Sequence, residues 1–484
     1  MTAPARADIR EAVSRRTQLL RDGRAAAGFD VDTMARFLAV TPDQLRALES
    51  GAVEPDGAML DRYARIFGLN VRRFLAGEAV GGAFSVLFRS MSATGAGLDE
   101  FVAVDAHRVL GEFARTTSDL ADLRRAVDEP SRWSEWCAAV AAPPLAPAED
   151  VARQAEALAL QVRARLGVGD APIPSVRALI REQFGVEVLF LDDGQLHPQI
   201  DGASTTQPIP AILVNLVYGA DKWWRTRMTL LHELCHLLFD RNLLAPRPDR
   251  LLLFSPEFHL RKQRRWQLLE RFADVEARAS AFAAHFLATS AAVRQLVGKD
   301  PPTAPEVVQR VMSHFGIGWV NAVNRLQDVF FLSSEEREAI AKPPRGGAVI
   351  GTTHPDTVRP EDLGLRGARL SELTRRALVA GTIDTVEARG FLGLRASDPL
   401  PSWEGVAAAD RAPIRPRTRD AEDAAIRHAM RETGAADFYI ESSQSLPGGH
   451  WRVVVGRSSA DGTPTSTDVF ELDALLRVVA RSAP

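Results

Sequence analysis

Apolar residues at helical spacing fill the start of the chain. Between residues 17 and 77, short periodic runs end at Gly, Thr or Asp, which are common at helix ends. Thr41 before Pro42 has the pattern of an N-cap followed by the first helical residue, and Gly51 stands where a C-terminal glycine is favoured. The pattern predicts a domain of four or five short helices at 17–77.

The middle of the chain alternates long helical patterns with short apolar runs. From about Ser85 to Trp136 the spacing is helical, and the Pro-rich stretch Ala141–Asp150 is predicted to be a linker, so residues 78–150 form a helical connector. A mixed domain is expected at 151–341. Its predicted helices are Val151–Leu166, Ile173–Phe184, Trp223–Phe239, Leu268–Leu287 and Pro305–Val329, and its predicted strands are Val186–Asp192 and Ala211–Leu216.

The C-terminal part begins after a Pro- and Gly-rich boundary at Lys342–Gly347. Residues 348–415 are predicted to hold a helical element and a Pro-rich linker. Residues 416–484 are predicted to form a small α/β domain of unknown role. Its elements would be helix Ala421–Glu432, strands in DFYIES, HWRVVVG and DVFEL, and helix Leu472–Arg481. The expected fold class is multidomain, mainly α with α+β parts.

Composition narrows the class of protein. With 484 residues and 46% apolar content, the chain can bury several cores. A net charge of −3 argues against a general polyanion binder, so any nucleic-acid contact would be local. Two cysteines cannot form a disulfide framework for this length. With neither a signal-peptide pattern nor a long apolar span, we expect a soluble cytoplasmic protein with no membrane partner.

The stretch LLHELCHLLFD, from Leu230 to Asp240, carries the candidate chemistry. On a helix His232 and His236 lie about 40° apart, so both imidazoles can bind one metal ion. Glu233 lies about 100° from His232, on the flank of that face, where its carboxylate can act as a general base on water without binding the metal. Ionisable groups in an apolar helix are costly unless bound or paired. The alternative is two core histidines beside a salt-bridged glutamate.

A hydrolytic zinc site needs a third protein ligand. The helix VEARASAFAAHFLA offers Asp274, Glu276 and His285. Glu276 is the preferred candidate because small Ala279 and Ala283 beside it would let this helix approach the histidine-bearing helix closely, whereas His285 points about 180° away from Glu276. The alternative is that Glu276 is an ordinary solvated glutamate.

These motifs together resemble the ImmA/IrrE family of zinc metallopeptidases. The resemblance rests on HELCHLLFD, on the preceding Ile200–Ala203 and Ile212–Asn215, and on the later pattern formed by Glu276, Ala279, Phe282, Ala283 and Ala284. It implies a zincin-like minimal peptidase domain, a small sheet plus the HExxH helix, that holds one Zn²⁺ per chain through His232, His236 and Glu276, with Glu233 as general base. His314–Val329 resembles the helix-turn-helix-like coda of such domains.

Two positions depart from the family pattern. Cys235 stands where the family usually has Gly, and it is expected either to pack in the core or, if exposed, to serve redox control. Ser280 replaces the usual Asn and, one turn from Glu276, could hydrogen-bond the ligand carboxylate as a second-shell residue. Tyr218, in the turn before the HExxH helix, is a candidate for stabilising the oxyanion.

The N-terminal residues resemble an Xre-type helix-turn-helix fold, with Thr41–Leu48 as the recognition helix. Gln44 and Arg46 are then the side chains best suited to contact DNA. Between Leu19 and Leu75, however, eight arginines face eight acidic residues, and carboxylates near the phosphates oppose binding. The domain is therefore expected either to bind DNA or to serve dimerisation, including a homodimer, or docking of another protein.

The leading hypothesis is an intracellular zinc-dependent endopeptidase linked to transcriptional or stress and phage-defence control. The family resemblance implies a protein substrate, a helix-turn-helix repressor or an antitoxin. Zinc-bound water would attack the scissile carbonyl, with Glu233 as base. The alternative is a DNA-binding transcriptional regulator whose metal centre is sensory or structural.

Overall fold

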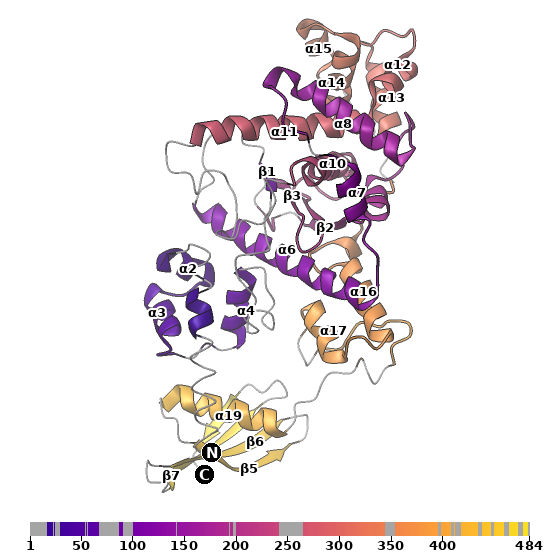
Figure 1. The fold of residues 1–484 in the computed structure, drawn as a ribbon. Helices are drawn as coiled ribbons and strands as arrows, with labels where there is room; N and C mark the ends of the chain where they lie inside the picture. Colours follow the sequence, from indigo (N-terminus) through magenta and orange to yellow (C-terminus); the bar gives the residue numbers. More distant parts are fainter. Residues whose placement is uncertain are drawn as a thin grey trace. The chain divides into compact units, whose positions relative to one another are not determined.

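The computed structural model of the chain divides into two compact units, Met1–Arg369 and Leu370–Pro484. Both are drawn in Figure 1. The structure describes residues 17–22, 24, 30–53, 55, 57–66, 87–90, 100–141, 143–192, 194–196, 200–241, 265–343, 354–394, 398–407, 411, 418–433, 438–446, 450–458, 464–472 and 478–482. Within these ranges the chain is mainly helical, with two four-stranded sheets. None of the described helices combines the length and apolarity that a bilayer span requires.

Short helices form the N-terminal part, as the pattern predicts. They are α2 (Val31–Leu38), α3 (Pro42–Ser50) and α4 (Gly57–Ile66). The Thr41 hydroxyl accepts from Gln44 N, the Gln44 side chain accepts from Thr41 N, and Gly51 ends α3 in the left-handed conformation, so the predicted caps are confirmed. These helices enclose a small apolar core that includes Leu38, Leu45 and Tyr63. Residues 67–77, the end of the expected first domain, lie outside the described ranges.

A four-stranded sheet lies at the centre of the first unit. Its strands are β1 (Leu87–Ser90), β2 (Glu187–Leu191), β3 (Ile200–Thr205) and β4 (Ala211–Asn215), in the order β1-β3-β4-β2. β2 and β4 are parallel, and the other pairs are antiparallel. β1 falls in a stretch predicted to be helical, and that prediction is wrong there. β1 has four residues, too few to show a period in the sequence, and its hydrogen bonds come from β3, which is distant in sequence.

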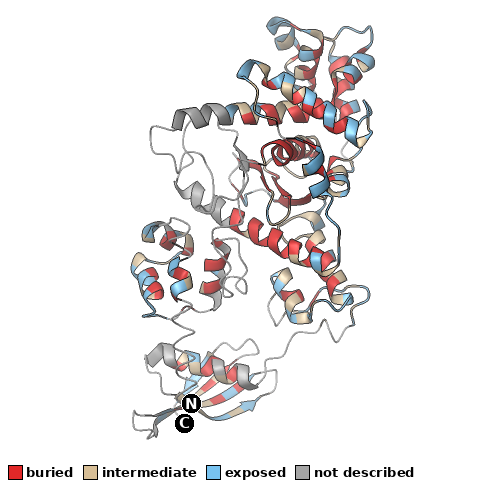
Figure 2. Cartoon of the chain, in the orientation of Figure 1, coloured by how far each residue is buried: buried red, intermediate tan, exposed pale blue. Residues whose placement is uncertain are grey.

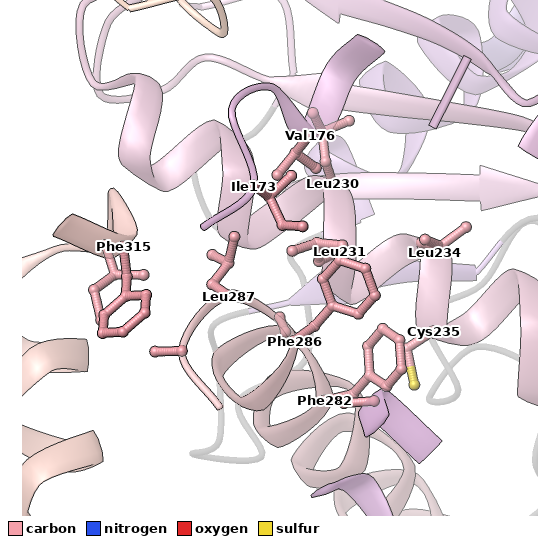
Figure 3. Packing of buried hydrophobic residues seen from close by; sticks show 14 of the residues in the cluster. Ile173, Val176, Leu230, Leu231, Leu234, Cys235, Phe282, Phe286, Leu287 and Phe315 are labelled. Atoms are coloured by element: carbon pink, nitrogen blue, oxygen red, sulfur yellow. The ribbon is translucent and has the colours of Figure 1, made fainter. Parts of the chain in front are cut away.

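Long helices pack in layers on this sheet. α10 (Trp223–Phe239) lies against β3 and β4, and α11 (Arg265–Leu287) packs on α10 and on α8 (Val151–Leu166). The short α9 (Val176–Leu179) continues into a π-type turn at Ile180–Phe184. The predicted helix from Ile173 therefore starts late, because Ser175 caps the helix that follows it. α8 and α11 pack closely, and α10 lies in the core between apolar side chains (Figure 3).

The predicted block Pro305–Val329 is two helices, α13 (Pro305–Phe315) and α14 (Trp319–Phe330). The chain breaks at Gly316, which has φ 61° and ends α13 in the left-handed conformation. α12 (Ser290–Val297) precedes this pair, and α15 (Ser334–Ile340) follows it. Neither was predicted, since each is only two turns long.

Segments expected to be connectors pack within the first unit. α6 (Glu100–Ala126) and α7 (Trp133–Ala139) precede the short turn Ala148–Asp150, and Trp136 lies in the main core with its indole donating to Gln183 O. Residues 354–369 also belong to this unit, because the division falls after Arg369 and not at the boundary expected at Lys342–Gly347. They include the turn Pro360–Asp362, and Asp356 is completely buried.

The second unit contains a helix pair and a separate sheet. Its helices are α16 (Ala368–Val379, which begins at the division), α17 (Thr385–Leu392) and α19 (Thr418–Thr433), and its strands are β5 (Phe438–Ser445), β6 (Trp451–Ser458), β7 (Pro464–Leu472) and β8 (Val478–Ser482). The strands pair antiparallel in that order. Buried residues of the sheet, among them Val453, Val455 and Phe470, form a core with α19, and Figure 2 colours buried positions red. The predicted helix Leu472–Arg481 is wrong at both ends, because Leu472 belongs to β7 and Val478–Arg481 to β8, which pairs with β7. Residues 473–477 lie outside the described ranges.

Candidate metal centre

The candidate chemistry lies on α10, which is buried along most of its length (Figure 2). His232, Glu233 and His236 expose 1%, 0% and 0% of their surface. The leucines around them account for this, because they cover almost every side of the helix and direct it into the core. Three ionisable side chains are therefore held out of water and need partners there.

Glu276 of α11 meets both histidines. Its Oε2 lies 3.1 Å from His232 Nε2 and its Oε1 lies 3.3 Å from His236 Nε2. The two Nε2 atoms are 3.0 Å apart. One donor atom from each residue lies within 4.8 Å of the others, so the three side chains could hold a metal ion. Of the candidates on α11, the structure brings Glu276 to the histidines.

The distances match a single small ion. A tetrahedral ion with bonds of about 2.0–2.1 Å separates its ligand atoms by about 3.3 Å, close to the observed spacing. Glu276 Oε1 is buried and accepts no hydrogen bond within the described residues. An ion between the three groups would satisfy this oxygen and both ring nitrogens. Two imidazoles and one carboxylate suit zinc, and also iron(II).

Hydrogen bonds on the far ring nitrogens orient both histidines. His236 Nδ1 donates to Asp240 Oδ2 at 2.8 Å, and His232 Nδ1 lies 3.3 Å from Ser280 Oγ. With the protons on Nδ1, both Nε2 lone pairs face Glu276, the tautomer that metal binding requires. Ser280 therefore contacts His232 and not the Glu276 carboxylate, which corrects the partner expected for it.

Sequence reasoning missed Asp240, although it stands in the motif stretch itself. Its second oxygen accepts a hydrogen bond from Arg278 of α11, and both side chains are buried. The signal was its spacing, four residues after His236, which places it on the same face of the helix. Asp240 thus links His236 to the helix that carries Glu276.

The electrostatics of the three groups are strongly coupled. Burial by itself lowers the pKa of His236, but the carboxylates of Glu276 and Asp240 outweigh it and raise this pKa well above the ordinary value. Burial raises the pKa of Glu276, but His236 and His232 outweigh it and lower this pKa. The site therefore favours a carboxylate facing positive charge, whether protons or a metal ion provide it.

Glu233 is held against the sheet. Ser204 of β3 donates to Glu233 Oε2 at 2.7 Å. Gly202, on the same strand, makes room: a Cβ there would lie 2.8 Å from Thr229 Cγ2 and 3.1 Å from Glu233 Oε1. The family resemblance includes Gly202, but Ser204 was missed because the contact joins residues 29 positions apart. The carboxylate is thus fixed next to His232 in the sequence and is not part of the cluster that could hold a metal ion.

No family model and no curated protein matches this sequence. The donor set is consistent with a metal centre, and Glu233 is an additional carboxylate that metal binding alone does not require.

Cys235 packs in the core. It is completely buried in the apolar cluster that also contains Phe282 and Phe286 (Figure 3). Burial raises the pKa of its thiol well above the ordinary value. A redox-active cysteine needs exposure and a lowered pKa, so the structure favours the packing hypothesis over redox control.

The remaining candidates lie away from the three ligands. His285 faces Glu156 at 3.6 Å, and burial together with Arg325 lowers its pKa to about 4. Tyr218 is 44% exposed, and the Arg225 guanidinium stacks on its ring at 3.5 Å. Tyr218 also lines a small cavity together with Thr229 of α10. Its role at the oxyanion stays a prediction.

A groove opens beside His232 and Ser280. It has a volume of about 750 Å³ and runs between α10, α11 and α14. We call it the α14 groove. The α10 residues Trp224, Met228 and His232 line it at one-turn spacing. A ligand in this groove would therefore have direct access to one metal ligand.

Gln44 and Arg46 lie on the surface of α3 and have local partners. Gln44 completes the capping box with Thr41, and Arg46 Nη1 lies 2.6 Å from Asp43 Oδ1. Exposed pairs of this kind contribute little stability and break readily. DNA binding through this helix stays a prediction.

Proposed function

We propose that this protein is a zinc-dependent endopeptidase. The observation that carries the proposal is Glu233, a fully buried carboxylate held by Ser204 beside three converging metal ligands. A structural metal site needs ligands but has no use for a further oriented carboxylate. A hydrolytic site needs a base at that place.

The roles of the residues follow from their positions. His232, His236 and Glu276 would hold the ion, while Asp240 and Ser280 would keep both imidazoles in the binding tautomer. Zinc supplies a Lewis acid that lowers the pKa of water and polarises the scissile carbonyl. Glu233 would take the proton from that water and return it to the leaving amine. Its hydrogen bond from Ser204 fixes the orientation of the carboxylate for both transfers.

The substrate class rests on the family resemblance. The ImmA/IrrE-like pattern around His232 and Glu276, together with an Xre-like N-terminal region, implies a protein substrate such as a helix-turn-helix repressor or an antitoxin. Three features fit a zincin-like domain: a small sheet, an HExxH helix beside it, and a glutamate from a later helix. We therefore propose regulatory proteolysis as the context of the activity.

The Glu233→Gln variant tests the catalytic role. It should bind zinc with the stoichiometry of the wild type, because Glu233 is not a ligand, and cleavage should fall about 10²–10⁴-fold, the usual contribution of a general base. Mass spectrometry of proteins captured by the variant in cells, compared with fragments made by the wild type, would identify the substrate. Glu306→Gln, on the exposed surface of α13, is the matched control and should retain activity.

Two outcomes would argue against a peptidase. If the wild type generates no fragments and the variant captures no protein, the metal centre is sensory or structural and the protein is better described as a regulator. If Glu233→Gln loses its zinc, the carboxylate belongs to the ligand set and has no separate role as base.

A further inference from the structure

The α14 groove is lined by α10, α11 and α14, and the three linings differ in chemistry. On the α10 wall, Trp224 and Met228 are apolar and lead along the helix to His232, with Arg225 and Thr229 beside them. Ala281 and Ala284 of α11 line the groove next to Ser280, so a ligand can approach this helix closely. This arrangement joins the groove to the metal centre.

The α14 wall presents amide side chains beside Arg325 and Asp328. Asn321, Asn324 and Gln327 follow one another along α14 at three-residue spacing and all line the groove. The Asn321 side chain is half-buried there. Asn324 Oδ1 accepts from Arg337 at 2.9 Å, which leaves its NH₂ group to donate. Amides both donate and accept, so they can pair with the N–H and C=O groups of a peptide backbone.

Val320 extends the same wall and is 60% exposed. An exposed apolar side chain beside amides is suited to a ligand that has both a polar backbone and apolar side groups. A volume of about 750 Å³ is within the range of pockets that enclose whole ligands, and is larger than a metal-bound water requires.

We propose that the α14 groove binds an extended stretch of polypeptide, with the α14 amides pairing with its backbone and the Trp224–Met228 wall receiving an apolar side chain next to the reacting bond. The proposal rests on the proposed peptidase function and names the substrate-binding surface of that same site. An extended chain directs its side chains to alternate sides, so one side chain can face the apolar wall while backbone groups face α14. Amide contacts accept many sequences, and specificity then comes mainly from the apolar position.

The test measures binding separately from cleavage. Full-length, zinc-loaded Glu233→Gln protein is immobilised and exposed to a peptide library made from a digested proteome, and mass spectrometry quantifies the retained peptides. Three further changes are made in this background: Ala284→Trp, which fills the groove; Asn321→Leu, which removes one amide; and Ala291→Trp, at an exposed alanine of α12, as the matched control. Zinc content and circular dichroism establish that each variant is folded.

We expect Ala284→Trp to reduce the retained peptides at least about tenfold and Asn321→Leu to reduce them about three- to tenfold. Ala291→Trp should match the parent, and the retained peptides should be enriched in apolar residues. If Ala284→Trp fails to fold, Asn321→Leu still tests the groove, because Asn321 is half-exposed on α14 and its replacement should not disturb the core.

Equal retention by the filled and control variants, or no retention by the parent above blank resin, would overturn the groove as a polypeptide site. Failure of the peptidase function gives a different result: peptides are retained through the groove, but the wild-type protein does not cleave them. Ala284→Trp is also made in the wild-type background. Cleavage that this change leaves unaffected would keep the peptidase and remove the groove.

Discussion

Single hydrogen bonds decide what the two histidines can do. An imidazole offers a lone pair to a metal only on the nitrogen that carries no proton, and the partner of the other nitrogen selects that state. Asp240 does this for His236, because its carboxylate only accepts, and the Ser280 hydroxyl lies 3.3 Å from Nδ1 of His232 and can accept the proton there. At the residue scale, the site therefore consists of ligands and of the groups that orient them.

Replacing the orienting carboxylate should weaken metal binding. Asp240→Asn is expected to lower zinc affinity about 10–100-fold, because an amide holds the Nδ1 proton of His236 less strongly than a carboxylate. Glu276→Ala should lose stoichiometric zinc altogether. Titration of the full chain against a competing chelator measures both effects.

Asp274→Asn provides the control for this series. Asp274 lies two residues from Glu276 on α11 but is not part of the ligand cluster. Its replacement should leave zinc affinity unchanged. An unchanged affinity in Glu276→Ala would instead remove Glu276 from the ligand set.

At the scale of elements, the close approach of β3 to α10 fixes the position of the Glu233 carboxylate. The strand can approach the helix because Gly202 has no side chain, and this approach brings Ser204 to Glu233. A short buried strand beside a buried helix is ordinary packing. Here it also positions the Glu233 carboxylate, so strand and helix together support the residue that we propose as the base.

Gly202→Ala should disturb this approach. The added methyl would lie 2.8 Å from Thr229 Cγ2 and 3.1 Å from Leu213 O, and backbone cannot easily move away. We expect a loss of about 1–3 kcal/mol in the free energy of unfolding, typical of overpacking, together with reduced cleavage. Denaturant unfolding and peptide cleavage measure the two effects. Gly390→Ala in α17, where a Cβ meets open space, should be neutral or stabilising.

At the scale of the whole molecule, the segment around His354 and Asp356 is anchored to α10, the helix that carries His232 and His236. Asp356 lies 2.8 Å from Arg227 of α10, and both are buried. Asp356 also accepts from Val176 N and Arg177 N at the start of α9, while His354 stacks on Trp223 with ring centroids 3.7 Å apart. Residues after the expected boundary at Lys342–Gly347 thus stabilise the first unit.

Asp356→Ala should destabilise the first unit strongly. It leaves Arg227 buried without its carboxylate, which usually costs about 3–5 kcal/mol. Urea unfolding followed by tryptophan fluorescence measures the loss. Glu361→Ala, which removes an exposed carboxylate from the same segment, should change stability by less than about 0.5 kcal/mol. Similar midpoints for the two variants would contradict the anchoring role.

Agreement between pattern and structure depends on the length of each element. The helices Val151–Leu166 and Trp223–Phe239 have the predicted bounds. A long helix repeats the same apolar spacing over many turns, so it can be predicted without knowing which elements pack against it. β1 and β8 were missed because short strands gain their hydrogen bonds from partners elsewhere in the chain. Gly316, which divides the predicted helical block Pro305–Val329 into two helices, is visible in the sequence, but its left-handed conformation is not.

The sequence by itself determined the placement of His232, Glu233 and His236 around one helix, because 3.6 residues per turn is a local property of the backbone. It also indicated Glu276, through small residues that permit close helix packing. Only the tertiary structure decided that Glu276 meets both rings, that Asp240 and Ser280 orient them, and that Gly202 and Ser204 bring the sheet to Glu233. These contacts join residues far apart in the chain, and their distances depend on how whole elements pack.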